Sequence, residues 1–126
     1  MSTEEVLDPA VVADLRRAQD AFGKPSFIRE LVDLFLASTP VKMDRIRRAL
    51  AAGDAEAVVQ AAHALRSNCG MLGAARMAGA FACMEDAAAG GDLAGAASAF
   101  KAAEEQLPGV LEALAELTDQ PPAPSP

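Results

Sequence analysis

Apolar residues recur every three or four positions through most of this 126-residue chain, which is the spacing of one face of an α-helix. The pattern is clearest in residues 58–72. At about 100° of rotation per residue, five side chains there point within roughly 40° of one direction. These are Val58, Ala62, Leu65, Cys69 and Leu72. A chain that repeats such stripes must pack helix against helix to remove them from water.

Turn and capping residues divide this pattern into five helices. Alanine is abundant and favours helix, whereas there are only five Phe and no Tyr or Trp. The predicted helices cover about 9–20, 25–52, 55–70, 74–89 and 93–117. Short loops between long helices are typical of antiparallel neighbours. The sequence therefore predicts an all-α fold, an up-down-up-down antiparallel four-helix bundle with a short extra N-terminal helix.

Two prolines fall inside predicted helices, where each removes one backbone hydrogen bond. For Pro40 we expect a kink near Ser38 or Thr39 rather than a termination. For Pro108, followed by Gly109, we expect the last helix to be interrupted or bent.

The same periodicity predicts which residues are buried. In the second helix the positions spaced for burial are Phe27, Ile28, Leu31, Leu34, Phe35, Leu36, Met43, Ile46 and Leu50. In the fourth helix they are Met77, Ala80, Phe81 and Met84. Cys69 and Cys83 do not form a C-x-x-C pair, and we expect both to be reduced and buried.

Length and charge limit the class of protein. The length supports one domain, predicted at 7–118, between a flexible N-terminus at 1–6 and a disordered, proline-rich tail at 119–126. The net charge of −7 argues against a nucleic-acid partner.

The chain lacks a signal-peptide pattern and a long apolar window, so we expect a cytoplasmic protein without membrane contact. We expect a monomer, because one bundle already buries each apolar stripe.

The charge is unevenly distributed along the chain. Through Arg48 there are eight basic and eight acidic residues, whereas from Ala49 onward there are three basic and ten acidic residues. Most of the cations therefore lie in the N-terminal half, where a local basic patch remains possible.

The chain contains a single histidine, His63, within the third predicted helix. On the helical wheel it lies about 140° from the core stripe and points to solvent. Arg66 and Ser67, at i+3 and i+4, share its face, and Gly70 leaves the approach open. Gln60 lies one turn before it. Such an imidazole is a candidate nucleophile or acid–base group, although a lone surface histidine is more often inert.

Enzymatic alternatives lack their motifs. The chain has no P-loop, no G-x-G-x-x-G and no kinase-type nucleotide motif, so we expect no phosphorylation from ATP. Cys69 lies roughly 120° from His63 on the same helix, which excludes a Cys–His nucleophile pair and a zinc site built on the two. We expect no cofactor of the chain's own.

The segment that begins at the histidine resembles the histidine-containing phosphotransfer (HPt) domain of multistep phosphorelays. The family motif is approximately H-x-L-K-G-S-(S/A)-x-x-(L/I)-G-A, and residues 63–74 read HALRSNCGMLGA. The resemblance extends over roughly Leu7 to Leu117. Two positions depart from the motif: Arg66 replaces the usual Lys, and Ser67 stands where Gly is most frequent.

The resemblance implies a phosphoryl carrier. His63 would accept a phosphoryl group from an aspartyl phosphate on a receiver domain and pass it to another receiver. The implied partners are response-regulator receivers and a hybrid sensor histidine kinase, and the receiver would supply Mg²⁺. Arg66 would offset the phosphoryl charge, Ser67 and Gly70 would keep the site uncrowded, and Gln60 would orient the ring or the phosphate.

Two acidic residues of the next helix, Glu85 and Asp86, are interpreted as a solvated face. Family geometry would bring that helix near His63, which makes Glu85 a candidate supporting residue.

A second hypothesis keeps the bundle without phosphoryl transfer. A helical adaptor would bind its partner through a cationic strip made of Arg45, Arg47, Arg48 and Arg66. Retention of His63 beside a cation and small neighbours favours the carrier.

Overall fold

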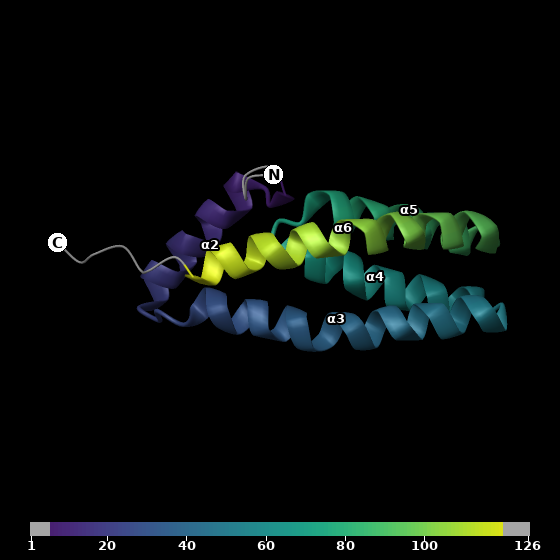
Figure 1. The fold of residues 1–126 in the computed structure, drawn as a ribbon, viewed down its shortest axis with the longest axis horizontal. Coiled ribbons are helices and arrows are strands. Elements are labelled where there is room, and N and C mark those ends of the chain that lie inside the picture. Colours follow the sequence, from purple (N-terminus) through teal and green to yellow (C-terminus); the bar gives the residue numbers. More distant parts are fainter. Residues whose placement is uncertain (1–5, 120–126) are drawn as a thin grey trace.

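The computed structural model describes residues 6–119, which form five helices and no strand (Figure 1). The helices are α2 (Pro9–Phe22), α3 (Phe27–Ala52), α4 (Ala55–Met71), α5 (Ala75–Ala89) and α6 (Leu93–Asp119). Each begins and ends within a few residues of its predicted position. The predicted all-α class is confirmed.

Local chemistry sets the helix ends. The Asp8 carboxylate accepts a hydrogen bond from the backbone N–H of Ala10 (2.9 Å), and that of Asp54 accepts one from Ala57 (3.1 Å). These bonds satisfy N–H groups that have no partner within the first turn. Gly53 ends α3 with φ of 70°, a left-handed conformation that residues with a Cβ rarely adopt.

The four long helices run side by side, and α2 lies at one end of them (Figure 1). α4 packs between α3 and α5, and α6 packs against α5 and α3. Hydrogen bonds join α3 to α6: Arg29 donates to the Thr118 carbonyl (3.0 Å), and Arg47 donates to Glu104 (3.1 Å). Early residues of α3 therefore lie beside late residues of α6. The arrangement is compatible with the predicted four-helix bundle and its extra N-terminal helix.

Two residues of α3 that were predicted to be buried are exposed. Leu34 is 66% and Leu36 is 44% exposed, whereas Phe35 between them is 3% exposed. Neighbours on a helix point about 100° apart, so three consecutive residues cannot all face one core. The core stripe of α3 runs through Phe35, and the prediction for Leu34 and Leu36 was wrong.

The two cysteines have different environments. Cys69 is fully buried, as predicted, whereas Cys83 is exposed. The buried stripe of α5 passes through Phe81 and Met84, and Cys83 points away from it. The prediction for Cys83 was wrong, and both thiols are free.

Both internal prolines are accommodated within continuous helices. α3 runs through Pro40, as predicted, and the kink near Ser38 or Thr39 stays a prediction. α6 runs through Pro108 without interruption, so an interruption there is excluded, and the alternative, a bend, stays a prediction. Ala103 and Val110 are both buried on either side of Pro108, so packing holds the helix together where one backbone hydrogen bond is lost.

The predicted terminal segments fall mostly outside the described residues. Of the predicted flexible N-terminus, Val6 is described, and it packs against the core. Of the predicted tail, Asp119 is described, and it is the last residue of α6. Across residues 6–119, none of the helices is long and apolar enough to cross a membrane.

Candidate functional site

The packing of α4 determines the direction of His63. The buried residues of this helix are Val58, Ala62, Leu65 and Cys69, the stripe expected from the sequence. The His63 side chain lies on the opposite side and is 60% exposed. The predicted solvent-facing orientation is confirmed.

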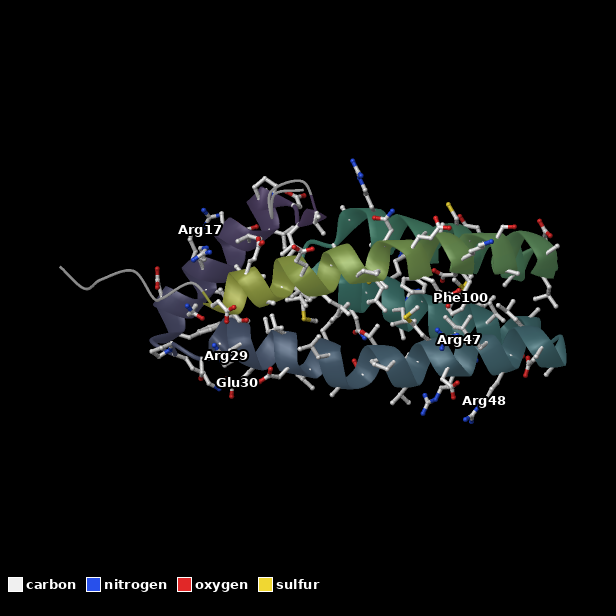
Figure 2. The ribbon with its side chains drawn as sticks, viewed as in Figure 1. Arg17, Arg29, Glu30, Arg47, Arg48 and Phe100 are labelled. Carbon is white, nitrogen blue, oxygen red and sulfur yellow. The ribbon has the colours of Figure 1, made fainter. Side chains whose placement is uncertain are left out.

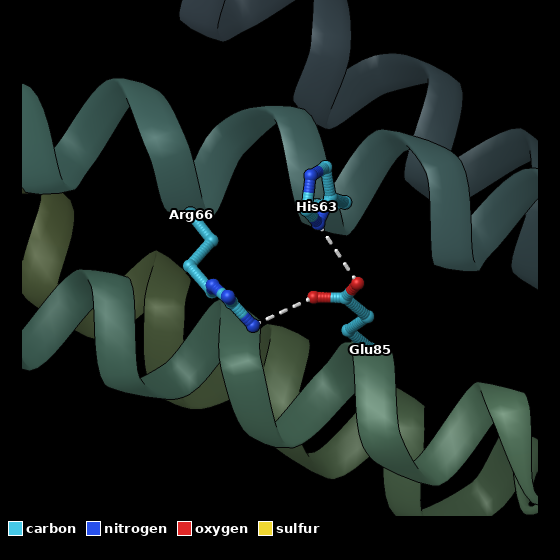
Figure 3. A network of polar contacts seen from close by, with 3 residues as sticks. All are labelled: His63, Arg66 and Glu85. Carbon is cyan, nitrogen blue, oxygen red and sulfur yellow. Dashed lines mark hydrogen bonds and ion pairs between the residues drawn. The ribbon is translucent and has the colours of Figure 1, made fainter.

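A carboxylate from the neighbouring helix holds the imidazole. Glu85 of α5 places Oε2 2.9 Å from Nδ1 of His63 and Oε1 3.0 Å from Nη1 of Arg66 (Figure 3). Its side chain is only 18% exposed, because it lies between α4 and α5. One carboxylate therefore joins the histidine and the arginine predicted for the site.

The contact with Glu85 decides which ring nitrogen is available. An ionised carboxylate only accepts hydrogen bonds, so Nδ1 of His63 carries the proton that joins the two groups. The lone pair of the neutral ring is then on Nε2. Figure 3 shows this second nitrogen on the side of the ring away from Glu85. The arrangement offers one nucleophilic nitrogen to an approaching molecule.

Arg66 brings a cation to the same site, as its i+3 position predicts. One of its N–H groups is engaged by Glu85, and its side chain is 45% exposed. A guanidinium carries five N–H donors in a planar fork, so several remain for an anion beside His63.

The other predicted site residues lie on the same helix as His63, and none of them forms a hydrogen bond to its ring within residues 6–119. Ser67 and Gly70 are both exposed on α4. A Cβ added to Gly70 would meet open space, so no protein neighbour requires glycine there. Gln60 is also exposed, and within residues 6–119 it makes no hydrogen bond to His63. The ring is oriented by Glu85 instead.

Gly73, the glycine near the end of the motif, has a structural role. Its φ is 79°, and its carbonyl accepts a hydrogen bond from the backbone N–H of Asp8 (2.7 Å). A Cβ at Gly73 would lie 3.1 Å from the Cβ of Val11 and 3.2 Å from the nitrogen of Asp8. The close approach anchors the chain ahead of α2 to the α4–α5 turn.

From the sequence, Glu85 was interpreted with Asp86 as a solvated face, and family geometry made it a candidate supporting residue; the structure places it against His63. Asp86 is exposed, as that interpretation expects. The signal for Glu85 was its position 22 residues after His63, on the next helix. That spacing becomes informative only when the offset between α4 and α5 is known.

The cationic strip of the adaptor hypothesis is divided among three directions. Arg47 stacks on Phe100 of α6 (5.3 Å), whereas Arg48 points outward from the bundle and pairs with Asp44 (Figure 2). Arg66 turns toward α5. Of the four arginines, only Arg45 and Arg48 line the same groove, between α3 and α4.

No three His, Cys, Asp or Glu side chains gather as a candidate metal site within residues 6–119. The chemistry of the described site therefore centres on one imidazole, one carboxylate and one guanidinium.

Comparison with known proteins identifies the family. Residues 30–119 match the family model of the Hpt domain. The chain belongs to the Hpt domain family. The matched range contains His63, Arg66 and Glu85, and it confirms the resemblance inferred from the motif. Membership places the chain among the histidine phosphotransfer proteins of phosphorelays.

The fold of this Hpt domain is similar to a solved structure, that of histidine-containing phosphotransfer protein B from Pseudomonas aeruginosa PAO1. The TM-score is 0.80 at 25% sequence identity, and the likeness covers 92% of this chain and 97% of that chain. No curated protein matches the sequence.

Proposed function

We propose that this Hpt domain is a phosphorelay intermediate that carries a phosphoryl group on Nε2 of His63. It accepts the group from the aspartyl phosphate of one receiver domain and passes it to the aspartate of another. The observation that carries the proposal is the 2.9 Å contact between Glu85 and Nδ1 of an exposed imidazole. The proposed partners are response-regulator receivers and a hybrid sensor histidine kinase, and the domain acts as a monomer without kinase activity toward ATP.

The transfer follows from the geometry at His63. The Nε2 lone pair attacks the phosphorus atom, the bond from phosphorus to the aspartate oxygen breaks, and the receiver carboxylate leaves with the electron pair. Positive charge develops on the ring, and Glu85, which accepts the Nδ1 hydrogen bond, stabilises it. The same steps in reverse transfer the phosphoryl group from Nε2 to the aspartate of a second receiver.

The positive charge of Arg66 offsets the negative charge of the phosphoryl group. Its other N–H groups donate to the phosphoryl oxygens, while its Nη1 donates to Glu85. The receiver would supply Mg²⁺, which would neutralise the remaining charge of the phosphoryl group.

Small residues keep the approach open. Ser67 and Gly70 follow His63 along the exposed face of α4, and the space above Gly70 is unoccupied by protein. A receiver must bring its aspartyl phosphate to within about 3–3.5 Å of Nε2, which bulky neighbours would prevent.

A labelling experiment tests the proposal. Receiver domains from hybrid kinases and response regulators are phosphorylated with radiolabelled acetyl phosphate and mixed with the wild-type protein or with His63→Gln. We expect acid-labile label on the wild type and none on the variant, because His63 is the chain's only histidine. Equal labelling of both proteins, or no label from any receiver, would overturn the proposal.

The adaptor hypothesis keeps less support than the carrier. Arg47 stacks on Phe100 of α6 and Arg66 turns to α5, so only Arg45 and Arg48 share a groove and the four arginines form no continuous strip. Binding of a receiver without any transfer to His63 in the same experiment would favour it.

A further inference from the structure

A groove of about 480 Å³ runs between α3 and α4, beside the site. Its apolar lining is made of small side chains, namely Ala49, Ala52, Ala57, Ala61 and Ala64. Because each methyl group is short, the gap between the two helices stays open to a larger apolar side chain from outside. Filling it would remove apolar surface from water on both partners.

Cations surround this apolar lining. Lys42, Arg45 and Arg48 all line the groove, and of these only Arg48 forms an ion pair in residues 6–119, with Asp44 (2.8 Å). The one acidic residue that lines the groove is Asp54, whose carboxylate already caps α4. The groove is therefore locally positive on a chain with a net charge of −7.

The groove lies next to His63 on α4. Gln60 and Ala64, which flank His63 in sequence, both line it. On the other side of His63 stands α5, where Glu85 contacts the ring and Asp86 is exposed. A partner that covers Nε2 thus meets a cationic, apolar side toward α3 and, toward α5, the Arg66–Glu85 ion pair and the exposed carboxylate of Asp86.

We propose that the receiver domain docks asymmetrically, over the α3–α4 groove rather than over α5. An apolar side chain of the receiver enters between the alanines, and carboxylates near its phosphorylation pocket meet Lys42 and Arg45. A pocket that holds Mg²⁺ and an aspartate is necessarily rich in carboxylates, which gives the charge complementarity. The inference rests on the proposed function, and it identifies the residues that position the partner of the same site.

The test compares charge-reversal variants in the α3–α4 groove with one on α5. The groove variants are Lys42→Glu and Arg45→Glu, and the matched control is Arg76→Glu, an exposed cation on the side of α5 opposite Glu85. The receivers that label the wild type serve as donors. Transfer rates are measured against receiver concentration, at low and high salt.

We expect each groove variant to lower the second-order rate constant of transfer about tenfold at low salt, and much less at high salt. The first-order rate constant at saturating receiver should stay unchanged, because Lys42 and Arg45 position the partner and do not take part in the chemistry. Arg76→Glu should behave as the wild type does.

Binding measured without transfer gives a second readout. In the His63→Gln background, calorimetry with the receiver in its beryllofluoride-bound form should show a Kd about tenfold higher when Arg45→Glu is added. An Ala61→Leu variant, whose helix content is checked by circular dichroism, fills the groove without changing charge and should weaken binding as well.

The outcomes separate the two proposals. If receivers label His63 and the groove variants match Arg76→Glu, the docking inference is wrong and the proposed function stands. If no receiver labels the wild type, the proposed function is wrong, and this inference is wrong with it.

Discussion

At the scale of single residues, the site depends on Glu85. A carboxylate that is 18% exposed contacts the histidine with one oxygen and the arginine with the other. Charge-assisted hydrogen bonds of this kind are stronger than neutral ones and fix the geometry of both partners. In the proposed transfer, Glu85 is therefore a positioning residue, which would act on the phosphoryl group through His63 and Arg66.

The proton position on His63 gives a direct test of this role. In ¹⁵N spectra of the wild type we expect the neutral-ring proton on Nδ1, and we expect Glu85→Ala to lose this preference. The transfer rate should fall about 10- to 100-fold, since a hydrogen bond to a charged group contributes about 1.5–3 kcal/mol and each 1.4 kcal/mol is a factor of ten.

Asp86→Asn is the control, because it removes an exposed carboxylate next to Glu85. It should leave both the spectrum and the rate unchanged. A wild-type spectrum with the proton on Nε2 would contradict the assignment.

Charge at Arg66 should matter more than the identity of the side chain. Arg66→Gln removes the cation beside the phosphoryl group, and we expect His63 to be labelled about tenfold more slowly. Arg66→Lys keeps the charge and should retain most of the rate, although it loses the planar fork. Arg76→Gln serves as the charge-matched control on α5, and equal rates for Arg66→Gln and Arg76→Gln would show that the Arg66 cation has no part in transfer.

At the scale of elements, the turn between α4 and α5 holds the N-terminal segment. Gly73 has a positive φ and lies close to Asp8 and Val11. We expect Gly73→Ala to lower the free energy of unfolding by about 1–3 kcal/mol, because it combines an unfavourable backbone conformation with close contacts. Urea denaturation followed by circular dichroism measures the change.

Gly79→Ala is the matched control for this prediction. Gly79 is exposed inside α5, and an added Cβ there would meet nothing within 4 Å. Alanine should raise the free energy of unfolding by about 0.5–1 kcal/mol through its higher helix propensity. Opposite signs at the two glycines are the expected result, and a neutral Gly73→Ala would refute the anchoring role.

Sequence periodicity predicted these elements well, for a physical reason. Hydrogen bonds within a helix join residues four apart, and caps such as Asp54 act over a single turn, so the information is local. The differences arose where tertiary packing outweighs local preference. Pro108 stays within α6 because both of its flanks are buried, and Leu34 is exposed because α3 has one core stripe.

At the scale of the whole molecule, the bundle encloses one ionisable thiol. Burial raises the pKa of Cys69 from 9.0 to about 12. In the unfolded chain the thiol loses its proton above its ordinary pKa, whereas the folded protein retains it up to the raised pKa. The contribution of Cys69 to the stability of the fold is therefore fully present below pH 9.0, and it is lost as the pH rises toward 12.

The free energy of unfolding of the wild type should therefore fall as the pH rises above 9.0. Cys69 can lower the free energy of unfolding by at most about 1.4 kcal/mol for each pH unit. Denaturation midpoints measured with Cys69→Ala, which lacks the thiol, should show a shallower dependence on pH. Identical pH profiles for the two proteins would contradict the burial effect.

The sequence by itself determined the all-helical class, the approximate ends of the helices, and the outward direction of His63 with Arg66 on its face. All of these follow from contacts within a few residues along the chain. Only the tertiary structure decided that Glu85 holds Nδ1, that Arg47 turns to α6 while Arg45 lines the α3–α4 groove, and that Gly73 meets Asp8. These contacts join distant residues, so they depend on the rotation and offset of each helix against its neighbours, which side-chain packing sets.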